Sequence, residues 1–587
     1  MTPPQPRLRG RWPHRFACVA APAIVPGNFA MLARLTGLAV LAVLAACKTV
    51  PEPSPPDAAL KSFSGPALLN HIKILASDEY EGRLPGTKGE QLSIKYIEEQ
   101  FKALQLEPGN PDGTYLQRVP LVGITPDPSM ALTFSTEGKP QKQAVLKFRD
   151  DFVAWTKRVA EDVSADGEAV FIGYGITAPE YQWDDFKGAD LKGKMLIVLV
   201  NDPGYEDESL FGGKAMKYYG RWTYKYEKAA ELGAAGCLIV HETGPAAYPW
   251  AVVALKGGEQ FDLSTPDKNA GRAAVEGWIT HEQAQALFKM AGKDYEALKK
   301  SALSRDIKPV PLGLRAQISI HNKLHEVESH NVVAKLTGSD PKLHKEFVVY
   351  TAHWDHFGIG PAVNGDKIYN GAVDNATGTG ALIEMARAYK QLMVPPKRSI
   401  LFLAVTAEEQ GLLGSRYYAE HPLYPLADTA VDINMDAMNV LGRTRDMVMI
   451  GKGNSTLDEI VEAAAHEQGR TVKPDAEPEK GFYYRSDHFN FAKLGVPAFD
   501  PEGGVDYIGR PEGWGMQQRD RYTREDYHKP SDKVRPDWDL SGAVEDMQLY
   551  FTVGYRVANE PKLPEWKPGA EFKATREASL RAAGKMK

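Results

Sequence analysis

The sequence predicts an α/β protein with a mixed, mostly parallel central sheet, helices on both of its faces, and a β-rich inserted module. From Val332 onward, apolar runs rich in β-branched residues alternate with helical patterns, which is typical of a parallel sheet covered by helices. Residues 140–325 interrupt this pattern with short apolar runs that are not followed by a cluster of metal-type side chains. A chain of 587 residues is also too long for a single hydrophobic core.

Two helical patterns occupy residues 59–135. In the first, four apolar side chains recur at helix spacing after Pro66, a residue suited to the first turn of a helix. The second runs from Gln91 to Leu104, and residues 77–87 between them form a polar, turn-rich loop. The four apolar residues are Leu68, Leu69, Ile72 and Leu75.

Residues 140–325 contain three apolar runs, at 169–176, 195–200 and 236–240, that are suited to buried strands. A helical pattern covers 227–232. This part of the sequence has no cluster of potential metal ligands. We therefore expect an inserted module that takes no direct part in catalysis.

Three apolar runs in the last part of the chain predict the strands of the parallel sheet: Phe347–Ala352, Ser399–Val405 and Val431–Met435. Helical patterns at Gly378–Tyr389 and Gly411–Tyr418 lie between them. The residues after 565 are mixed in charge, and we expect this tail to be poorly ordered.

These sequence patterns divide the chain into six segments. Residues 1–47 are expected to be a signal peptide of the lipoprotein type, 48–58 a proline-rich linker, and 59–135 the N-terminal part of the main domain. Residues 136–325 are the insert, 326–558 the part of the main domain that carries the candidate site, and 559–587 a C-terminal tail.

An apolar stretch, Leu35–Ala46, follows Arg34 and stops at Cys47. Its length suits the h-region of a signal peptide and is too short for a helix that spans a membrane. The residues Leu44-Ala45-Ala46-Cys47 resemble a bacterial lipoprotein signal, which implies an exported chain anchored to a membrane through a lipidated Cys47. Lys48 follows where an inner-membrane retention aspartate would stand, so the resemblance implies the periplasmic face of the outer membrane. An ordinary secretory signal is the alternative.

The composition excludes some classes of partner. With 70 basic and 76 acidic side chains, the formal net charge is −6, and no basic stripe is interleaved with aromatic residues, so nucleic acid is not an expected partner. If Cys47 carries lipid, Cys237 is the one thiol left in the processed chain, and stability must come from the core. The sequence does not indicate an oligomeric state.

Each of the three predicted strands leads into a side chain of a type that binds metal. His353 follows the first strand, Glu408 and Glu409 the second, and Asp436 the third. Because the carboxyl ends of parallel strands meet at one edge of a sheet, these groups are expected to converge. Two further candidates are Asp374, in a loop before a helix, and His528, in a late loop.

Imidazole and carboxylate side chains suit Zn²⁺, and a catalytic zinc site keeps one position open. Five ligands are too many for one such ion, but they suffice for two ions if Asp374 bridges them. Each residue alone has an ordinary alternative, since a histidine after a strand is commonly structural and an Asp before a helix is commonly an N-cap. Only the complete set predicts a two-ion site.

As an ordered set, five motifs resemble those of the two-zinc aminopeptidases. That family includes bacterial leucyl aminopeptidases, glutamate carboxypeptidases, glutaminyl cyclases and the catalytically inactive transferrin receptor. The resemblance covers residues 72–557 apart from the insert, which looks like the protease-associated (PA) domain found at this place in many members. The motifs are His353-Trp354-Asp355, residues 370–378 (NGAVDNATG), residues 406–415 (TAEEQGLLGS), Asn434-Met435-Asp436 and Tyr527-His528.

The resemblance implies two Zn²⁺ ions and a ligand set for each. One zinc would take His353, Asp374 and Asp436. The other would take Asp374, Glu409 and His528.

The resemblance also implies roles for neighbouring residues. Glu408 would be the general base, which needs a pKa raised toward neutrality. Asp355 would accept the imidazole N–H of the ligand two residues earlier, and Tyr527 would stabilise the oxyanion, with a packing role as its alternative. The family often has a cis peptide after the bridging Asp, so one is expected between residues 374 and 375. Apart from the resemblance, residues 485–488 form a loop rich in polar groups and are expected to line the pocket.

These roles imply an exported zinc aminopeptidase that hydrolyses N-terminal residues from peptides by metal-activated water. The metal ligands do not decide which peptide end is held, so a carboxypeptidase or dipeptidase of the same family is an alternative. A glutaminyl cyclase fits less well because those enzymes use one zinc. A non-catalytic binding lipoprotein should show eroded ligand or base positions, and none is eroded in this sequence.

Overall fold

The computed structural model describes residues 53–136, 140–255 and 258–586. The signal peptide expected at 1–47, with Cys47, and the first part of the linker expected at 48–58 lie outside these ranges. Residues Glu52–Lys587 form one compact unit. Among the helices of the described ranges, none combines the length and the apolar character that crossing a membrane requires.

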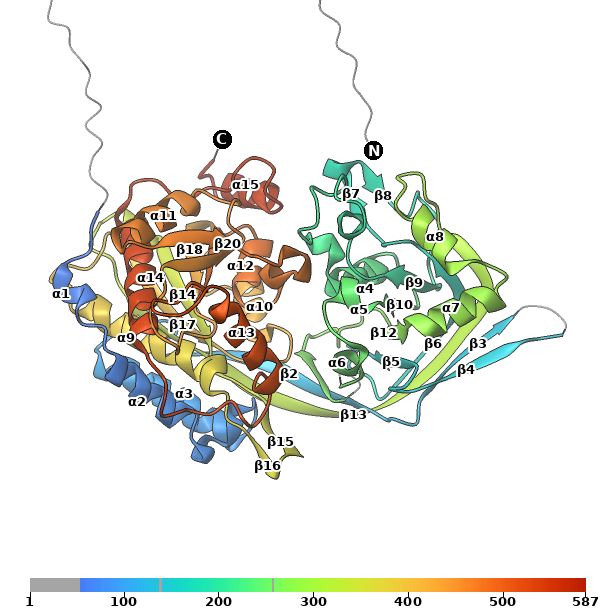
Figure 1. Cartoon of the computed structure of the whole chain (residues 1–587), viewed down its shortest axis with the longest axis horizontal. Helices are drawn as coiled ribbons and strands as arrows, with labels where there is room; N and C mark the ends of the chain where they lie inside the picture. Colours follow the sequence, from blue (N-terminus) through green and yellow to red (C-terminus); the bar gives the residue numbers. More distant parts are fainter. Residues whose placement is uncertain (1–52, 137–139, 256–257, 587) are drawn as a thin grey trace, which may run out of the picture. The chain divides into compact units, whose positions relative to one another are not determined.

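A mixed sheet forms the centre of the main domain (Figure 1), and its middle strands are parallel. β14 (Phe347–His353) lies parallel to β17 (Ser399–Val405) on one side and to β18 (Thr429–Asn434) on the other. β18 is also parallel to β21 (Ala498–Glu502), whereas β13 (Val310–Leu336) pairs antiparallel with β17. The strands predicted from the three apolar runs are confirmed. On the far side of β21 the sheet continues through β19 (Asp446–Ile450) and β20 (Thr471–Pro474).

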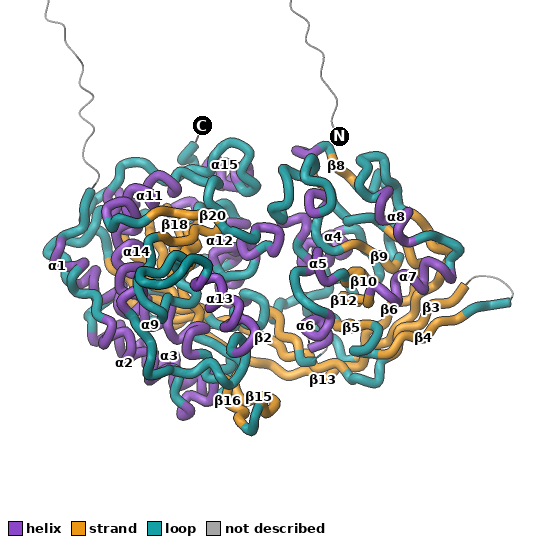
Figure 2. Tube along the Cα trace, in the orientation of Figure 1, coloured by secondary structure: helices purple, strands orange, loops and turns teal. Residues whose placement is uncertain are grey.

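The three central strands are buried along their whole length, which is why their sequences are continuous apolar runs instead of alternating ones. Val348 and Tyr350 of β14 face one hydrophobic cluster, and Val349 between them faces another. Helices contribute side chains to both clusters, and Figure 2 shows these helices in purple around the orange strands. α9 (Gly378–Lys390) and α14 (Ser541–Asn559) contribute to the first cluster, and α10 (Leu413–Glu420) and α12 (His488–Lys493) to the second.

Two N-terminal helices match the helical patterns of the sequence. α2 (Gly65–Leu75) begins after Ser64, whose side chain accepts the N–H of Ala67, and it has proline in its first turn. α3 (Lys88–Ala103) begins after the capping residue Thr87. The apolar face of α2 packs into the same cluster as α9.

The insert has its own strands and its own hydrophobic clusters. Its parallel strands are β6 (Asp162–Phe171), β9 (Met195–Leu199), β10 (Gly236–His241) and β12 (Val275–Thr280), which neighbour one another in this order. The three apolar runs are therefore strands, although the first strand ends at Phe171. Helices α4 (Trp222–Glu231), α7 (His281–Met290) and α8 (Tyr295–Ser301) accompany them.

β13 spans 27 residues and belongs to both groups of strands. Its first part pairs with β6 and β3 (Ala131–Thr136) of the insert, and its second part pairs with β2 (Leu116–Pro126) and β17. Figure 1 shows this strand continuing from the insert into the main sheet. It crosses the expected boundary between residues 325 and 326 without a break.

The expectation of a poorly ordered tail is wrong. The tail contains α15 (Lys573–Ala582), and Arg576 on this helix is buried. The Arg576 guanidinium donates hydrogen bonds to the carbonyl oxygens of Leu426 and Thr429, at 2.9 and 2.8 Å. These distant backbone partners fix the helix, and a charged local sequence does not reveal them.

Candidate metal centre

Three loops bring metal-type side chains to one edge of the sheet. β14 ends at His353, Glu408 and Glu409 follow β17, and Asp436 follows β18. Because the three strands are parallel, their carboxyl ends lie at the same edge. The structure therefore brings these groups together, as the sequence pattern predicts.

The first cluster consists of His353, Asp374 and Asp436. Nε2 of His353 lies 3.2 Å from Oδ1 of Asp374 and 3.2 Å from Oδ1 of Asp436. The potential ligand atoms of all three residues lie within 4.8 Å of one another. The other carboxylate oxygen of Asp436 accepts a hydrogen bond from the Ser486 hydroxyl at 2.7 Å.

The second cluster shares Asp374 with the first. Oδ2 of Asp374 lies 3.3 Å from Nε2 of His528, and Oε2 of Glu409 lies 3.2 Å from the same nitrogen. Asp374 therefore directs one oxygen toward each of two imidazoles. This is the arrangement expected of a carboxylate that bridges two cations.

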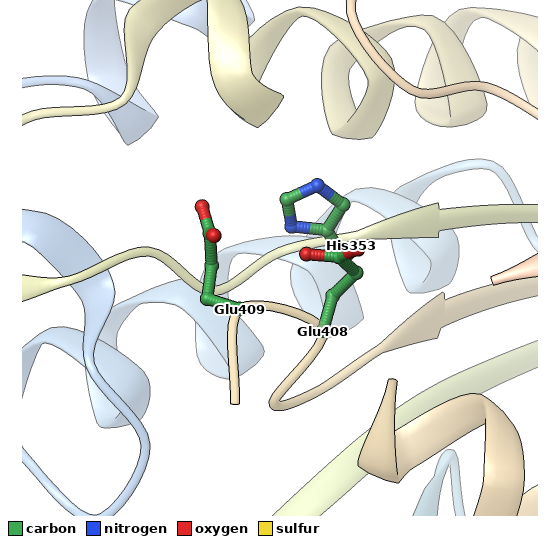
Figure 3. Close-up of side chains that lie close together, drawn as sticks. All are labelled: His353, Glu408 and Glu409. Carbon is green, nitrogen blue, oxygen red and sulfur yellow. The ribbon is translucent and has the colours of Figure 1, made fainter. Parts of the chain in front are cut away.

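Glu408 lies beside His353 (Figure 3), and the ligand atoms of His353, Glu408 and Glu409 lie within 4.8 Å of one another. Burial raises the pKa of the Glu408 carboxyl well above its usual range, although the charge of His353 opposes the shift. Ala407, just before it, has a φ of 53°, a left-handed conformation that turns the chain at the end of β17.

Asp355 makes a contact different from the expected one. Its Oδ1 lies 3.8 Å from Nδ1 of His353, which is too far for a hydrogen bond, and Nδ1 contacts the Asp355 backbone carbonyl at 3.2 Å instead. The carboxylate accepts the backbone N–H groups of Glu408 and Glu409, at 3.0 and 3.4 Å. Asp355 therefore orients the loop that carries the two glutamates.

The Tyr527 ring stacks on the ring of His528, with centroids 3.7 Å apart and an interplanar angle of 28°. Burial raises the pKa of Tyr527 well above its usual value, so the phenol keeps its proton at neutral pH. The stacking agrees with a packing role for Tyr527. The retained O–H is also the donor that the oxyanion role requires.

The loop that carries Asp374 is held from two sides. The carboxylate of Asp532 accepts the backbone N–H groups of Val373 and Asp374, at 3.0 and 3.1 Å. Asn375 donates its side-chain amide to the carbonyl of Met435 at 2.9 Å, which ties this loop to the loop of Asp436. The expected cis peptide between Asp374 and Asn375 is confirmed.

Residues 485–488 reach the site through one side chain. Ser486 contacts Asp436, as described above. The carboxylate of Asp487 accepts a hydrogen bond from the Ser415 hydroxyl. His488 is buried, and burial lowers its pKa to about 3, so it is neutral at physiological pH.

Two site residues were missed in the sequence pattern. Nδ1 of His356 lies 2.6 Å from Oε1 of Glu409, and His356, Asp374 and Glu409 form a further group that could hold a metal ion. Arg83 is buried and donates to the backbone carbonyls of Trp354 and Asn370, which lie on two ligand-bearing loops. The position of His356 three residues after His353 was an available signal, whereas Arg83 had none in its local sequence.

The donor atoms fit a divalent cation. Oε1 of Glu409, Nε2 of His528 and both ring nitrogens of His356 are buried without a hydrogen-bond partner in the part of the chain that the structure describes. Buried polar atoms left unpaired are costly, and cations coordinated by them would remove that cost. Mixed imidazole and carboxylate donors suit zinc.

Known proteins share this region of the chain. The aminopeptidase YwaD of Bacillus subtilis is 28% identical over 279 residues, which make up 46% of this chain and 46% of that protein. The glutamate carboxypeptidase 2 homolog of Caenorhabditis elegans is 24% identical over 321 residues, 47% of this chain and 38% of that protein. The chain thus spans less than half the length of these curated relatives.

Among solved structures, an aminopeptidase from Aneurinibacillus sp. strain AM-1 aligns with a TM-score of 0.47 and 20% identity, covering 86% of this chain and 96% of that chain. Residues 331–552 match the model of Peptidase family M28. That range contains every one of the metal-type side chains described above. Residues 331–552 are therefore a domain of peptidase family M28, related to aminopeptidases and to glutamate carboxypeptidase-like proteins.

Proposed function

We propose that this chain is a zinc-dependent aminopeptidase that removes N-terminal residues from peptides and uses two zinc ions. The observation that carries the proposal is the position of Asp374, whose two oxygens lie 3.2 and 3.3 Å from different imidazoles. The family of the domain and its similarity to a bacterial aminopeptidase support the choice of reaction.

The two clusters define the ligands. His353, Asp374 and Asp436 would hold one ion, and Asp374, Glu409 and His528 would hold the other. Three protein ligands leave a position open, as a catalytic zinc site requires. When bound, zinc supplies Lewis acidity toward the peptide carbonyl and lowers the pKa of water.

Glu408 is the residue that moves the proton. Its carboxylate takes a proton from the attacking water and delivers it to the nitrogen of the leaving amine, a task suited to a carboxyl whose pKa is raised by burial. Glu409, its neighbour, directs its oxygens at His528 and His356 and is not free for this task. The Tyr527 O–H donates to the oxygen on which negative charge develops.

A test of the base assignment is Glu408→Gln. The variant should keep its zinc, because Glu408 belongs to neither ligand set, and lose about 10²–10⁴-fold in kcat on an aminoacyl anilide. Metal analysis and steady-state kinetics measure both quantities. Glu512→Gln, on an exposed loop, should behave as the unaltered protein. Full activity of the Glu408 variant would refute the assignment.

The aminopeptidase reading is tested by the peptide terminus. A free ammonium group is attracted by a site rich in carboxylates, so free peptides should be cleaved much faster than the same peptides with an acetylated N-terminus. The alternative is a carboxypeptidase, which the similarity to a glutamate carboxypeptidase 2 homolog favours. Cleavage of acetylated peptides as fast as free ones, together with loss of cleavage when the C-terminus is amidated, would establish the alternative.

Export and anchoring are part of the proposal. Lipidation of Cys47 would place the enzyme on the periplasmic face of the outer membrane, and the insert, as a PA-type module, would restrict access to the site. Labelled fatty acid should enter the unaltered chain and the Cys18→Ala variant but not Cys47→Ala. Equal labelling of the three proteins would exclude a lipid on Cys47.

A further inference from the structure

His356 lies inside the metal centre without a role in the two ligand sets. It lies in the loop that follows the last residue of β14, His353, and its side chain is fully buried. The ring lies near His528, with centroids 6.0 Å apart. Its Nδ1 is 2.6 Å from Oε1 of Glu409, the oxygen that does not face His528.

The backbone makes room for this ring beside the loop of Asp374. Gly371 has a φ of 56°, and a Cβ atom at this position would lie 2.6 Å from Cγ of His356 and 2.3 Å from the backbone oxygen of Asp374. Any side chain at residue 371 would therefore displace the imidazole from the loop. The close approach depends on glycine.

The short contact between His356 and Glu409 lacks the angular geometry of a hydrogen bond. Neither ring nitrogen of His356 has a hydrogen-bond partner among the described residues, and the same is true of Oε1 of Glu409. The two atoms approach each other without the alignment that a shared proton requires. Buried polar atoms left in this state cost free energy, and the pair faces a cluster that already contains Asp374.

The potential ligand atoms of His356, Asp374 and Glu409 all lie within 4.8 Å of one another. Asp374 and Glu409 are also the carboxylates of the second proposed zinc site, whose third member is His528. A cation held there would be within reach of the unpaired imidazole. The nitrogen and the oxygen would then both point at the same ion, which explains their lack of mutual alignment.

We propose that His356 is a fourth protein ligand of the zinc site formed by Asp374, Glu409 and His528, an inference that rests on the proposed function. Four protein ligands make a closed site, whereas three leave a position open. The two ions would then differ: the ion at the His356 site is retained, and the ion beside His353 is the one that is open to substrate. Glu408 lies beside His353 (Figure 3) and therefore next to the open ion.

The experiment compares zinc binding by the purified unaltered protein, His356→Gln and His356→Ala. The unaltered protein should bind two zinc ions, one of them much more tightly. Both variants should lose the tight site, with affinity reduced by more than the roughly 10–100-fold that follows removal of an outer partner of a ligand. The control is His71→Gln, a buried histidine of α2 that bonds Tyr96 and lies outside the metal centre.

The His356→Gln variant distinguishes a metal ligand from a residue that only contacts Glu409. The glutamine amide can replace a hydrogen bond to Glu409, but it cannot replace an imidazole ligand. X-ray absorption at the zinc edge gives a readout independent of activity and of any variant. The unaltered protein with two zinc ions should show three imidazole ligands shared between them.

Two imidazoles for the pair of ions, or unchanged affinities in His356→Gln, would overturn the role of His356 and leave the proposed function intact. An unaltered protein that binds no zinc would overturn both.

Discussion

Arg83 shows how a single residue shapes the site without touching it. Its guanidinium donates four hydrogen bonds to backbone carbonyls, and it is 1% exposed. Burial lowers its pKa to about 10 while the nearby carboxylates oppose the shift, so it remains a cation at neutral pH. It therefore ties the end of α2 to the loop after β14 and to the loop that carries Asp374, and it places a positive charge next to a cluster of carboxylates. The acceptors are the carbonyl oxygens of Leu75, Trp354, Asn370 and Gly371.

Replacing Arg83 by lysine keeps the charge but removes the planar fork that serves several carbonyls at once. Some of the acceptors would be left unpaired in a buried place, and we expect the free energy of unfolding to fall by about 2–4 kcal/mol. Zinc affinity should fall as well, because two ligand-bearing loops lose their common support. Urea unfolding and zinc titration measure the two effects. Arg521→Lys, at an exposed position, should change neither, and equal behaviour of the two variants would contradict the role of Arg83.

Among the elements, the strands of the main sheet could be predicted and the pairing of β13 could not. β14, β17 and β18 are buried on both faces, so each leaves a continuous apolar run whose end carries a metal-type side chain. β13 owes its length to partners in two separate groups of strands, and such distant pairings have no local signature. His356 differs, because its position three residues after His353 was a local signal, whereas its contact with Glu409 in another loop has none.

α15 supplies a prediction for an element that the sequence did not reveal. Arg576 on this helix bonds the carbonyl of Thr429, the first residue of β18. Arg576→Ala would leave this carbonyl and that of Leu426 unpaired, and the free energy of unfolding should fall by about 2–4 kcal/mol. In hydrogen exchange, the backbone amides around α15 should lose protection first. Activity should be kept, because the metal centre lies at the opposite ends of the strands.

The comparison for this test is Arg581→Ala on the same helix. Arg581 is half exposed, and its one ion pair within the described ranges is with Glu577, at 3.6 Å. Its removal should therefore lower the free energy of unfolding by at most about 1 kcal/mol. Similar losses in the two variants would mean that the buried guanidinium does not dock the tail.

At the scale of the whole molecule, the metal centre exists only in the folded chain. Its side chains come from segments that begin with Arg83 and end with Asp532, and they gather many carboxylates around few cationic groups. Burial raises the pKa of both Asp355 and Asp487 to about 7. Without zinc, the ionised forms of such groups repel one another, so zinc binding and folding are expected to be coupled.

Removal of zinc should therefore lower the melting temperature, and the loss should grow with pH. In the metal-free protein the folded-state pKa values near 7 of Asp355 and Asp487 lie above their unfolded values near 4. The folded state then binds more protons than the unfolded state between these values, and its stability falls as pH rises through this window, by up to about 1.4 kcal/mol per pH unit and group. Zinc at about 100 times its dissociation constant raises the free energy of unfolding of the loaded protein by about 2.7 kcal/mol. At higher pH, protons compete less with zinc for the ligand atoms.

Both effects increase the difference in melting temperature between zinc-loaded and metal-free protein as the pH rises from 5 to 7. Melting curves with and without EDTA at several pH values measure that difference, with calcium-saturated EDTA and re-addition of zinc as controls. Because ionisation of these carboxylates increases toward the upper end of this range, an EDTA effect that is absent at pH 7, or one that shrinks as pH rises, would show that the cluster does not depend on bound cations for its stability.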